Sequence, residues 1–156
     1  MSKCMFDKEV SYLGHVISKE GVKVDPKKIK SITEWMKPTN ISKLRGFLGL
    51  TGYYIRFIWN YVHITAPLSN LLKKNDFQWS VEADKCFEAL KGIMSSMPLL
   101  ATPDFSKPFV IECDTLGYGL GAILIQDEHS ISFENMKLNN REQLKSIYDK
   151  EMLVIM

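Results

Sequence analysis

Hydrophobic residues near the start of the chain follow a strand pattern first and a helical pattern afterwards. Residues 9–17 are rich in β-branched and aromatic side chains and predict a strand, followed by a turn at 18–21 and a short return strand at 22–24. Asp25 followed by Pro26 then predicts the N-cap and first turn of a helix. We therefore expect a β-hairpin that leads into helices.

A second helix is expected after Thr39 or Asn40, either of which can cap it. Its apolar stripe has helical spacing and consists of Ile41, Leu44, Phe47 and Leu48. Glycine recurs every three residues in the same segment, at Gly46, Gly49 and Gly52. Glycine costs a helix about 0.8–1 kcal/mol relative to alanine, so the repeat indicates close approach of a backbone or a break. With a short helix opened by Pro67, residues 25–74 are expected to form a compact, basic helical bundle.

The second half begins with one more helix and then changes to strands. Ser80 is a candidate N-cap for a helix that runs to about residue 97. Three strands at 109–113, 118–126 and 131–135 predict an antiparallel meander, with Asp114 ending the first of them. A last helix is expected from about Glu142. Its apolar stripe consists of Leu144, Ile147, Tyr148, Met152 and Ile155.

Composition excludes several classes of protein. The chain has 156 residues, 46% hydrophobic and 24% charged, which is typical of one globular domain or two small ones. No apolar stretch approaches the roughly 18–20 residues of a membrane span, and charge stands where a signal peptide needs an apolar core. We therefore expect no membrane partner and an intracellular location. Cys4, Cys86 and Cys113 are too scattered to predict a disulfide framework or a zinc site.

The net charge of +2 conceals an uneven distribution. Residues 1–80 hold 13 lysines and arginines against 6 acids, whereas residues 81–156 hold 7 against 12. Such asymmetry is expected of a half that faces nucleic acid, or of ordinary solvated surfaces.

The basic half contains two candidate contacts with nucleic acid. Lys43 and Arg45 accompany Gly46 and Gly49, whose missing side chains leave room for a nucleic-acid backbone or, equally, for another helix. Arg56 lies in an aromatic cluster that favours a core position, with base stacking or phosphate contact as the alternative.

Two carboxylates stand out by their position. Asp114 follows the most apolar strand, and Glu151 falls on the apolar stripe of the last helix, where burying an unpaired charge is costly. Convergent carboxylates suit a divalent metal such as Mg²⁺ in phosphoryl transfer. The alternative is that Asp114 is a turn residue and that Glu151 pairs with a nearby lysine.

Longer motifs closely resemble the Pol polyprotein of gypsy-type LTR retrotransposons, in order and over nearly the whole chain. Those of the first half are Tyr12-Leu-Gly-His-Val-Ile-Ser18, Asp25-Pro-x-Lys-Ile29, Pro38-Thr-Asn40, Leu44-Arg-Gly-Phe-Leu-Gly-Leu-Thr-Gly-Tyr-Tyr54 and Ala66-Pro-Leu68. Those of the second half are Phe77-x-Trp79, Leu100-x-x-Pro-Asp-Phe-Ser-Lys-Pro-Phe109 and Lys150-Glu-Met152.

The resemblance implies a division of the chain and an α+β fold. Residues 1–24 would be the end of the reverse transcriptase palm, 25–75 a helical thumb, and 76–156 the N-terminal part of an α/β ribonuclease H domain, a three-stranded antiparallel meander plus its first helix. The hairpin residues Tyr12, Leu13, Gly14 and His15 would grip the primer 3′ end. The helix that carries Lys43, Arg45, Gly46 and Gly49, with Arg56 beyond it, would lie against the template–primer duplex.

The resemblance also implies a metal site. Asp114 and Glu151 match two of four carboxylates that hold two divalent ions, Mg²⁺ or Mn²⁺, for hydrolysis of RNA in an RNA/DNA hybrid. Thr115-Leu116 replaces the usual Ala-Ser after the aspartate, and Tyr54-Ile-Arg-Phe57 lacks one arginine. No Tyr-x-Asp-Asp occurs, and the third and fourth carboxylates are absent.

Three functional hypotheses follow. The first is a fragment of a reverse transcriptase/ribonuclease H, an RNA-directed DNA polymerase and nuclease by family but inactive as an isolated chain. The second is a domesticated, non-enzymatic module that binds nucleic acid through the basic thumb, with affinity that falls steeply with salt. The third is a residual nuclease completed by a partner chain, such as the remaining Pol segments.

Overall fold

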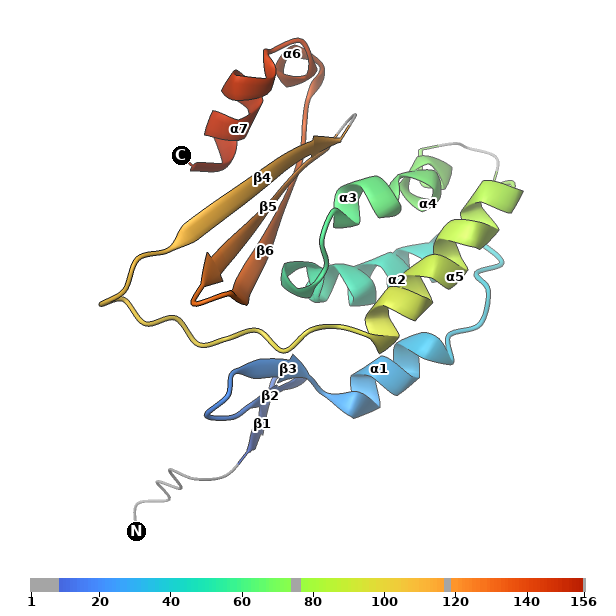
Figure 1. The fold of residues 1–156 in the computed structure, drawn as a ribbon. Helices are drawn as coiled ribbons and strands as arrows, with labels where there is room; N and C mark the ends of the chain where they lie inside the picture. Colours follow the sequence, from blue (N-terminus) through green and yellow to red (C-terminus); the bar gives the residue numbers. More distant parts are fainter. Residues whose placement is uncertain (1–8, 74–76, 117–118, 156) are drawn as a thin grey trace.

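The fold combines two three-stranded antiparallel sheets with a group of helices (Figure 1). A computed structural model describes residues 9–73, 77–116 and 119–155, without the side chains of residues 116, 151, 154 and 155. No helix among these residues has the length and the apolar character needed to cross a membrane. The expected mixture of helices and antiparallel strands is confirmed.

The first sheet consists of β1 (Val10–Tyr12), β2 (His15–Ile17) and β3 (Val22–Val24), paired in that order. The single strand expected over residues 9–17 is wrong, because the chain reverses at Leu13 and Gly14. Their φ angles of +48° and +79° are the two left-handed positions of a type I′ hairpin turn. The expected turn at 18–21 and the return strand after it are both present.

The helices begin where the capping residues predict. Asp25 accepts a hydrogen bond from the backbone N–H of Lys27, and Asn40, not Thr39, accepts one from Lys43. Ser80 caps the long helix of the second half in the same way. The elements are α1 (Pro26–Thr33), α2 (Ile41–Tyr53), the 3₁₀ turn η1 (Ile55–Phe57), α3 (Tyr61–Ile64), α4 (Ala66–Leu71) and α5 (Val81–Ser95).

The main hydrophobic core lies between these helices. Leu44 and Phe47 of α2 are fully buried against Phe87 and Leu90 of α5 and Ile32 of α1. The rings of Phe47 and Phe87 are 4.6 Å apart, within the range of favourable aromatic contact. The apolar face of α2 is therefore turned inward, which leaves Gly46 and Gly49 exposed, whereas Gly52 is half-buried beside Tyr61.

The second sheet consists of β4 (Val110–Leu116), β5 (Gly119–Gln126) and β6 (His129–Lys137), and the expected meander is present. The expectation that Asp114 ends the first strand of the meander is wrong. Asp114 lies inside β4, opposite Gly121. The strand continues because Thr115 and Leu116 pair with residues of β5, and the glycine opposite Asp114 has no side chain to oppose the carboxylate.

The C-terminal helix differs most from its prediction. Two helices, α6 (Asn140–Gln143) and α7 (Ile147–Ile155), replace the single helix expected from Glu142. Ser146 interrupts it, since its hydroxyl accepts a hydrogen bond from the backbone N–H of Asp149 and so caps α7. Helix α7 contacts β4 and β5, yet the expected apolar stripe does not face the sheet. The stripe members Leu144, Ile147, Tyr148 and Met152 are exposed, and the side chain of the fifth member, Ile155, lies outside the described residues.

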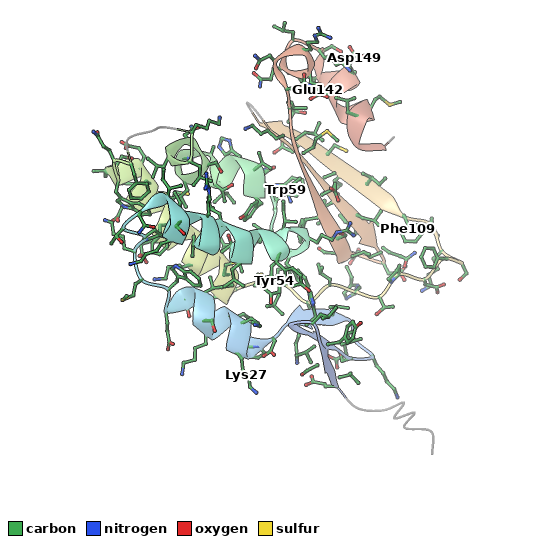
Figure 2. The ribbon with its side chains drawn as sticks, turned by 180° about the vertical axis from the view of Figure 1, so that it is seen from behind. Lys27, Tyr54, Trp59, Phe109, Glu142 and Asp149 are labelled. Atoms are coloured by element: carbon green, nitrogen blue, oxygen red, sulfur yellow. The ribbon has the colours of Figure 1, made fainter. Side chains whose placement is uncertain are left out.

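A single asparagine side chain joins the second sheet to the helices. Asn135 of β6 accepts a hydrogen bond from the backbone N–H of Tyr61 at 2.7 Å and donates to the carbonyls of Ile58 at 2.9 Å and Ile55 at 3.3 Å. The ring of Trp59 packs edge-on against Phe133 beside it. These contacts attach β6 to residues 55–64, whereas α7 contacts β4 and β5 (Figures 1 and 2).

Candidate nucleic-acid interface

The tip of the first hairpin is exposed but held firmly. Tyr12 and His15 pair across the turn, and the side chains of Tyr12 and Leu13 are more than 60% exposed. The hydroxyl of Tyr53 donates to the carbonyl of Leu13 at 2.8 Å, and that of Tyr54 donates to the carbonyl of Gly14 at 3.3 Å. The hairpin tip is thus fixed to the C-terminal end of α2.

Aromatic rings surround His15 at this junction. Its ring lies 5.4–5.6 Å from those of Tyr53, Tyr54 and Phe57. Burial, followed by the proximity of Tyr53 and Asp25, raises the pKa of the Tyr54 hydroxyl. Tyr54 therefore stays protonated well above neutral pH and remains a hydrogen-bond donor to the hairpin.

The outer surface of α2 forms a side-chain-poor strip that runs to the hairpin. Lys43, Gly46, Gly49 and Tyr53 follow one another at helical spacings of three and four, and Arg45 adjoins Gly49. We call these five residues the α2 strip. All five residues are exposed, and the hydroxyl of Tyr53 also contacts the hairpin.

The glycines of the α2 strip have open space in front of them. A Cβ at Gly49 would meet nothing within 4 Å, and one at Gly46 would meet only the ring of Trp35 at 3.6 Å. Among the residues that the structure describes, no helix packs on this surface. In the described part of the chain, the glycines therefore do not serve to pack another helix, and the α2 strip is open to a ligand.

Arg56 occupies a different position from the α2 strip. It is exposed on η1 and lines a cleft of about 320 Å³ together with His15, Leu100 and Pro103. Its aromatic neighbours Tyr54 and Phe57 are buried, as a core interpretation of the cluster predicts. The structure thus places Arg56 beside the hairpin.

Asp114 lies on a defined face of the second sheet. Strand register places Asp114, Gly121 and Asn135 on the same face, which is the face that contacts residues 55–61. A Cβ at Gly121 would overlap the side-chain oxygen of Asn60, so this glycine allows the close contact. Asp114 is half-buried beside it, and its carboxylate has no hydrogen-bond or ion-pair partner among the described residues.

The second predicted carboxylate, Glu151, falls within α7, and its side chain lies outside the described residues. Helix α7 itself contacts the strand that carries Asp114. Within the described part of the chain, no three histidine, cysteine, aspartate or glutamate side chains are grouped to hold a metal ion. A half-buried carboxylate such as that of Asp114 offers the hard oxygen ligands that Mg²⁺ prefers.

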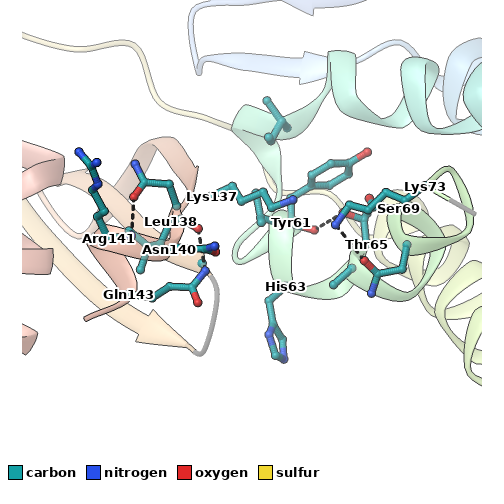
Figure 3. A pocket seen from close by; sticks show the side chains of 16 residues that line it. Tyr61, His63, Thr65, Ser69, Lys73, Lys137, Leu138, Asn140, Arg141 and Gln143 are labelled. Carbon is teal, nitrogen blue, oxygen red and sulfur yellow. Dashed lines mark hydrogen bonds between the residues drawn. The ribbon is translucent and has the colours of Figure 1, made fainter. Parts of the chain in front are cut away.

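A large cleft that the sequence did not predict lies between the helices and the second sheet (Figure 3). It has a volume of about 1140 Å³, and Lys73, Lys137 and Arg141 line it. These cations come from segments far apart in the chain, so no local motif could reveal them. Tyr53 was also missed, although its helical spacing from Gly49 was a usable signal.

Known proteins with similar sequences agree with the resemblance found in the motifs. Residues 79–156 match the family model described as the RNase H-like domain found in reverse transcriptase. The Retrovirus-related Pol polyprotein from transposon 297 of Drosophila melanogaster is 42% identical over 159 residues, which cover 99% of this chain and 15% of that protein. An uncharacterized mitochondrial protein of Arabidopsis thaliana is 50% identical over 111 residues, 69% of this chain and 70% of its own length.

Solved structures show the same fold. The foamy viral protease-reverse transcriptase in complex with RNA/DNA hybrid superposes with a TM-score of 0.83 at 20% sequence identity, over 94% of this chain and 21% of that one. The same viral enzyme in complex with dsDNA gives a TM-score of 0.81. This chain thus spans only a small part of the polyproteins and of the viral enzyme that it resembles.

Proposed function

Because the chain belongs to the family of RNase H-like domains found in reverse transcriptases, we propose that it forms the part of such an enzyme that holds the nucleic-acid duplex. Residues 1–24 end the palm, 25–75 form the thumb, and 76–156 begin the ribonuclease H domain. The ligand is an RNA/DNA hybrid or a template–primer duplex, and other Pol segments supply the polymerase site.

The observation that carries this proposal is the continuity between the α2 strip and the hairpin tip. Lys43 and Arg45 provide positive charge for phosphates, and Gly46 and Gly49 allow a backbone to approach the helix closely. Tyr53 then connects the strip to the hairpin tip. A duplex lying along α2 would reach the hairpin, where the exposed Tyr12 and Leu13 side chains would contact a strand end.

Filling the strip without destabilising the helix tests the proposal. We expect Gly49→Leu to raise stability by about 0.5–1 kcal/mol, because leucine is the better helix former. The same substitution should weaken binding of a labelled RNA/DNA hybrid about tenfold, or about 1.4 kcal/mol, because its side chain prevents close approach. Binding is measured by fluorescence anisotropy across a salt series.

Gly92→Leu is the matched control, since Gly92 is also an exposed helical glycine with nothing within 4 Å. It should raise stability similarly and leave hybrid binding unchanged. Equal binding by both variants would contradict a duplex on the α2 strip. Negligible binding by the parent chain at physiological salt would exclude the domesticated binding module as well.

Hydrolysis of the RNA strand requires more than this chain contributes. Asp114, with Glu151, would hold a divalent metal, which when bound activates water and stabilises the leaving oxygen. The 156-residue chain carries two of the four carboxylates that the family uses. Asp114 lies on the sheet face that contacts residues 55–61, and in this proposal it would orient one ion.

We therefore expect the purified chain and its Asp114→Asn variant to cleave a labelled hybrid equally poorly with Mg²⁺ or Mn²⁺. The measurement is the rate of product formation on a denaturing gel, with a complete ribonuclease H as positive control. Cleavage that the Asp114→Asn substitution abolishes would show instead that the chain assembles a working site.

A further inference from the structure

The large cleft of Figure 3 has two walls from distant parts of the chain. One wall is formed by α3 and α4, with Lys73 and His63 among its residues. The other is formed by the end of β6 and by α6, with Lys137 and Arg141. Its volume of about 1140 Å³ exceeds the roughly 300–1,000 Å³ of small-molecule pockets, so it has room for several linked groups.

The cleft is positively charged on both walls. Lys73, Lys137 and Arg141 are basic, and no aspartate or glutamate is among the described residues that line the cleft. Lys137 and Arg141 make no ion pair with any described carboxylate, and the Lys73 ammonium donates only to the neutral Asn70 side chain at 3.3 Å in that part of the chain. Lys137 and Arg141 belong to residues 81–156, in which acidic residues outnumber lysines and arginines by 12 to 7. Positive charges that line a concave surface attract polyanions.

The neutral groups of the cleft also favour phosphates. Amide side chains that can donate hydrogen bonds line both walls, from Asn70 on one side to Asn140 and Gln143 on the other. The tyrosine at the cleft, Tyr61, is only 7% exposed, and its hydroxyl is 2.8 Å from that of Thr51. Its ring is therefore not available for base stacking. The exposed imidazole of His63 also lines the cleft, but the three cations and the amides make the phosphate backbone of the ligand the main target of recognition.

We propose that this cleft binds the phosphate backbone of a single nucleic-acid strand, independently of sequence. The nature of the ligand rests on the proposed function, whereas the location does not, because no residue of the α2 strip or the hairpin tip lines the cleft. A strand that leaves the duplex would be held between α4 and α6. Salt should weaken this binding because phosphate contacts release counterions.

The test removes two cations from one wall. Each phosphate contact to a single strand contributes about 0.7 to the slope of log affinity against log salt concentration. The double variant Lys137→Gln/Arg141→Gln removes two such contacts, so it should lower this slope by about 1.4. At about 0.1 M salt, its affinity for a labelled single-stranded DNA should fall roughly 25-fold. Lys85→Gln/Lys107→Gln, with both lysines exposed outside the cleft, is the control for net charge. All four side chains are exposed, and thermal unfolding checks that each variant is folded.

An equal effect of the two double variants would overturn the proposal, because general charge would then explain the loss. So would an unchanged single-strand affinity in the cleft variant. The Gly49→Leu variant separates the two sites. It should retain single-strand binding and lose hybrid affinity, whereas the cleft variant should do the reverse. If Gly49→Leu leaves hybrid binding intact, the duplex proposal fails while the cleft result still stands.

Discussion

Asn135→Ala should destabilise the chain by about 3 kcal/mol. The substitution removes the side chain that satisfies the backbone N–H of Tyr61 and the carbonyl groups of Ile58 and Ile55. Ile58 is 1% exposed and Tyr61 is 7% exposed, so water does not readily replace the lost partner. Leaving a buried polar group unsatisfied costs about 1–3 kcal/mol, which exceeds the value of the hydrogen bond itself.

The measurement is urea-induced unfolding followed by circular dichroism. Asn139→Ala is the matched control, because the Asn139 side chain also accepts hydrogen bonds from two backbone N–H groups, those of Arg141 and Glu142. Those groups are at an exposed helix end where water can replace the cap, so the expected cost is only about 1 kcal/mol. Equal losses in the two variants would mean that Asn135 does not join the sheet to the helices.

Local chemistry explains why most elements were predictable. Asp25, Asn40 and Ser80 cap helices where the sequence predicts, since a capping side chain and its N–H partner are only two or three residues apart. The meander was predictable for the same reason, because each hairpin depends on neighbouring segments. The division between helices and strands is therefore encoded locally.

The errors arise where a short local signal competes with pairing or capping. Leu13 reads as part of an apolar strand, but the turn places it at φ +48°, which the tyrosine hydroxyls of α2 help to hold. Asp114 reads as a turn residue, and only its pairing with Gly121 reveals that the strand continues. The apolar spacing from Leu144 onwards predicts a buried stripe, yet Leu144 and Tyr148 are more than 80% exposed.

The candidate site was predictable to the extent that its residues are neighbours in sequence. Lys43, Arg45 and the glycines lie within one helix, so their spacing could be read directly. The attachment of the hairpin to Tyr53 spans 40 residues, and the cationic cleft brings Lys73 next to a wall more than 60 residues further along the chain. Such contacts depend on how the sheets pack on the helices.

A further long-range contact, between Val22 and Leu100, leads to the other large expected effect. Gly21 has φ +143°, a conformation in which side chains are strained, and a Cβ there would overlap the carbonyl oxygen of Leu100. Val22 and Leu100 exchange two backbone hydrogen bonds at 2.7 and 2.9 Å beside it, so the first sheet is joined to the segment that precedes the second. Gly21→Ala therefore strains the backbone, at about 1–3 kcal/mol, and its Cβ also forces the strands of this bridge apart.

We expect Gly21→Ala to lower the free energy of unfolding by about 3–4 kcal/mol, since strain adds to the loss of one or both bridge hydrogen bonds at about 1 kcal/mol each. Gly92→Ala should instead raise the free energy of unfolding, by up to about 1 kcal/mol, because Gly92 has open space around it in a helix that favours alanine over glycine. Both are measured by urea denaturation against the parent chain. A loss below about 1 kcal/mol at Gly21 would show that the hairpin sheet can shift away from Leu100 at little cost. The hairpin tip would then not be held rigidly enough to position a strand end beside α2.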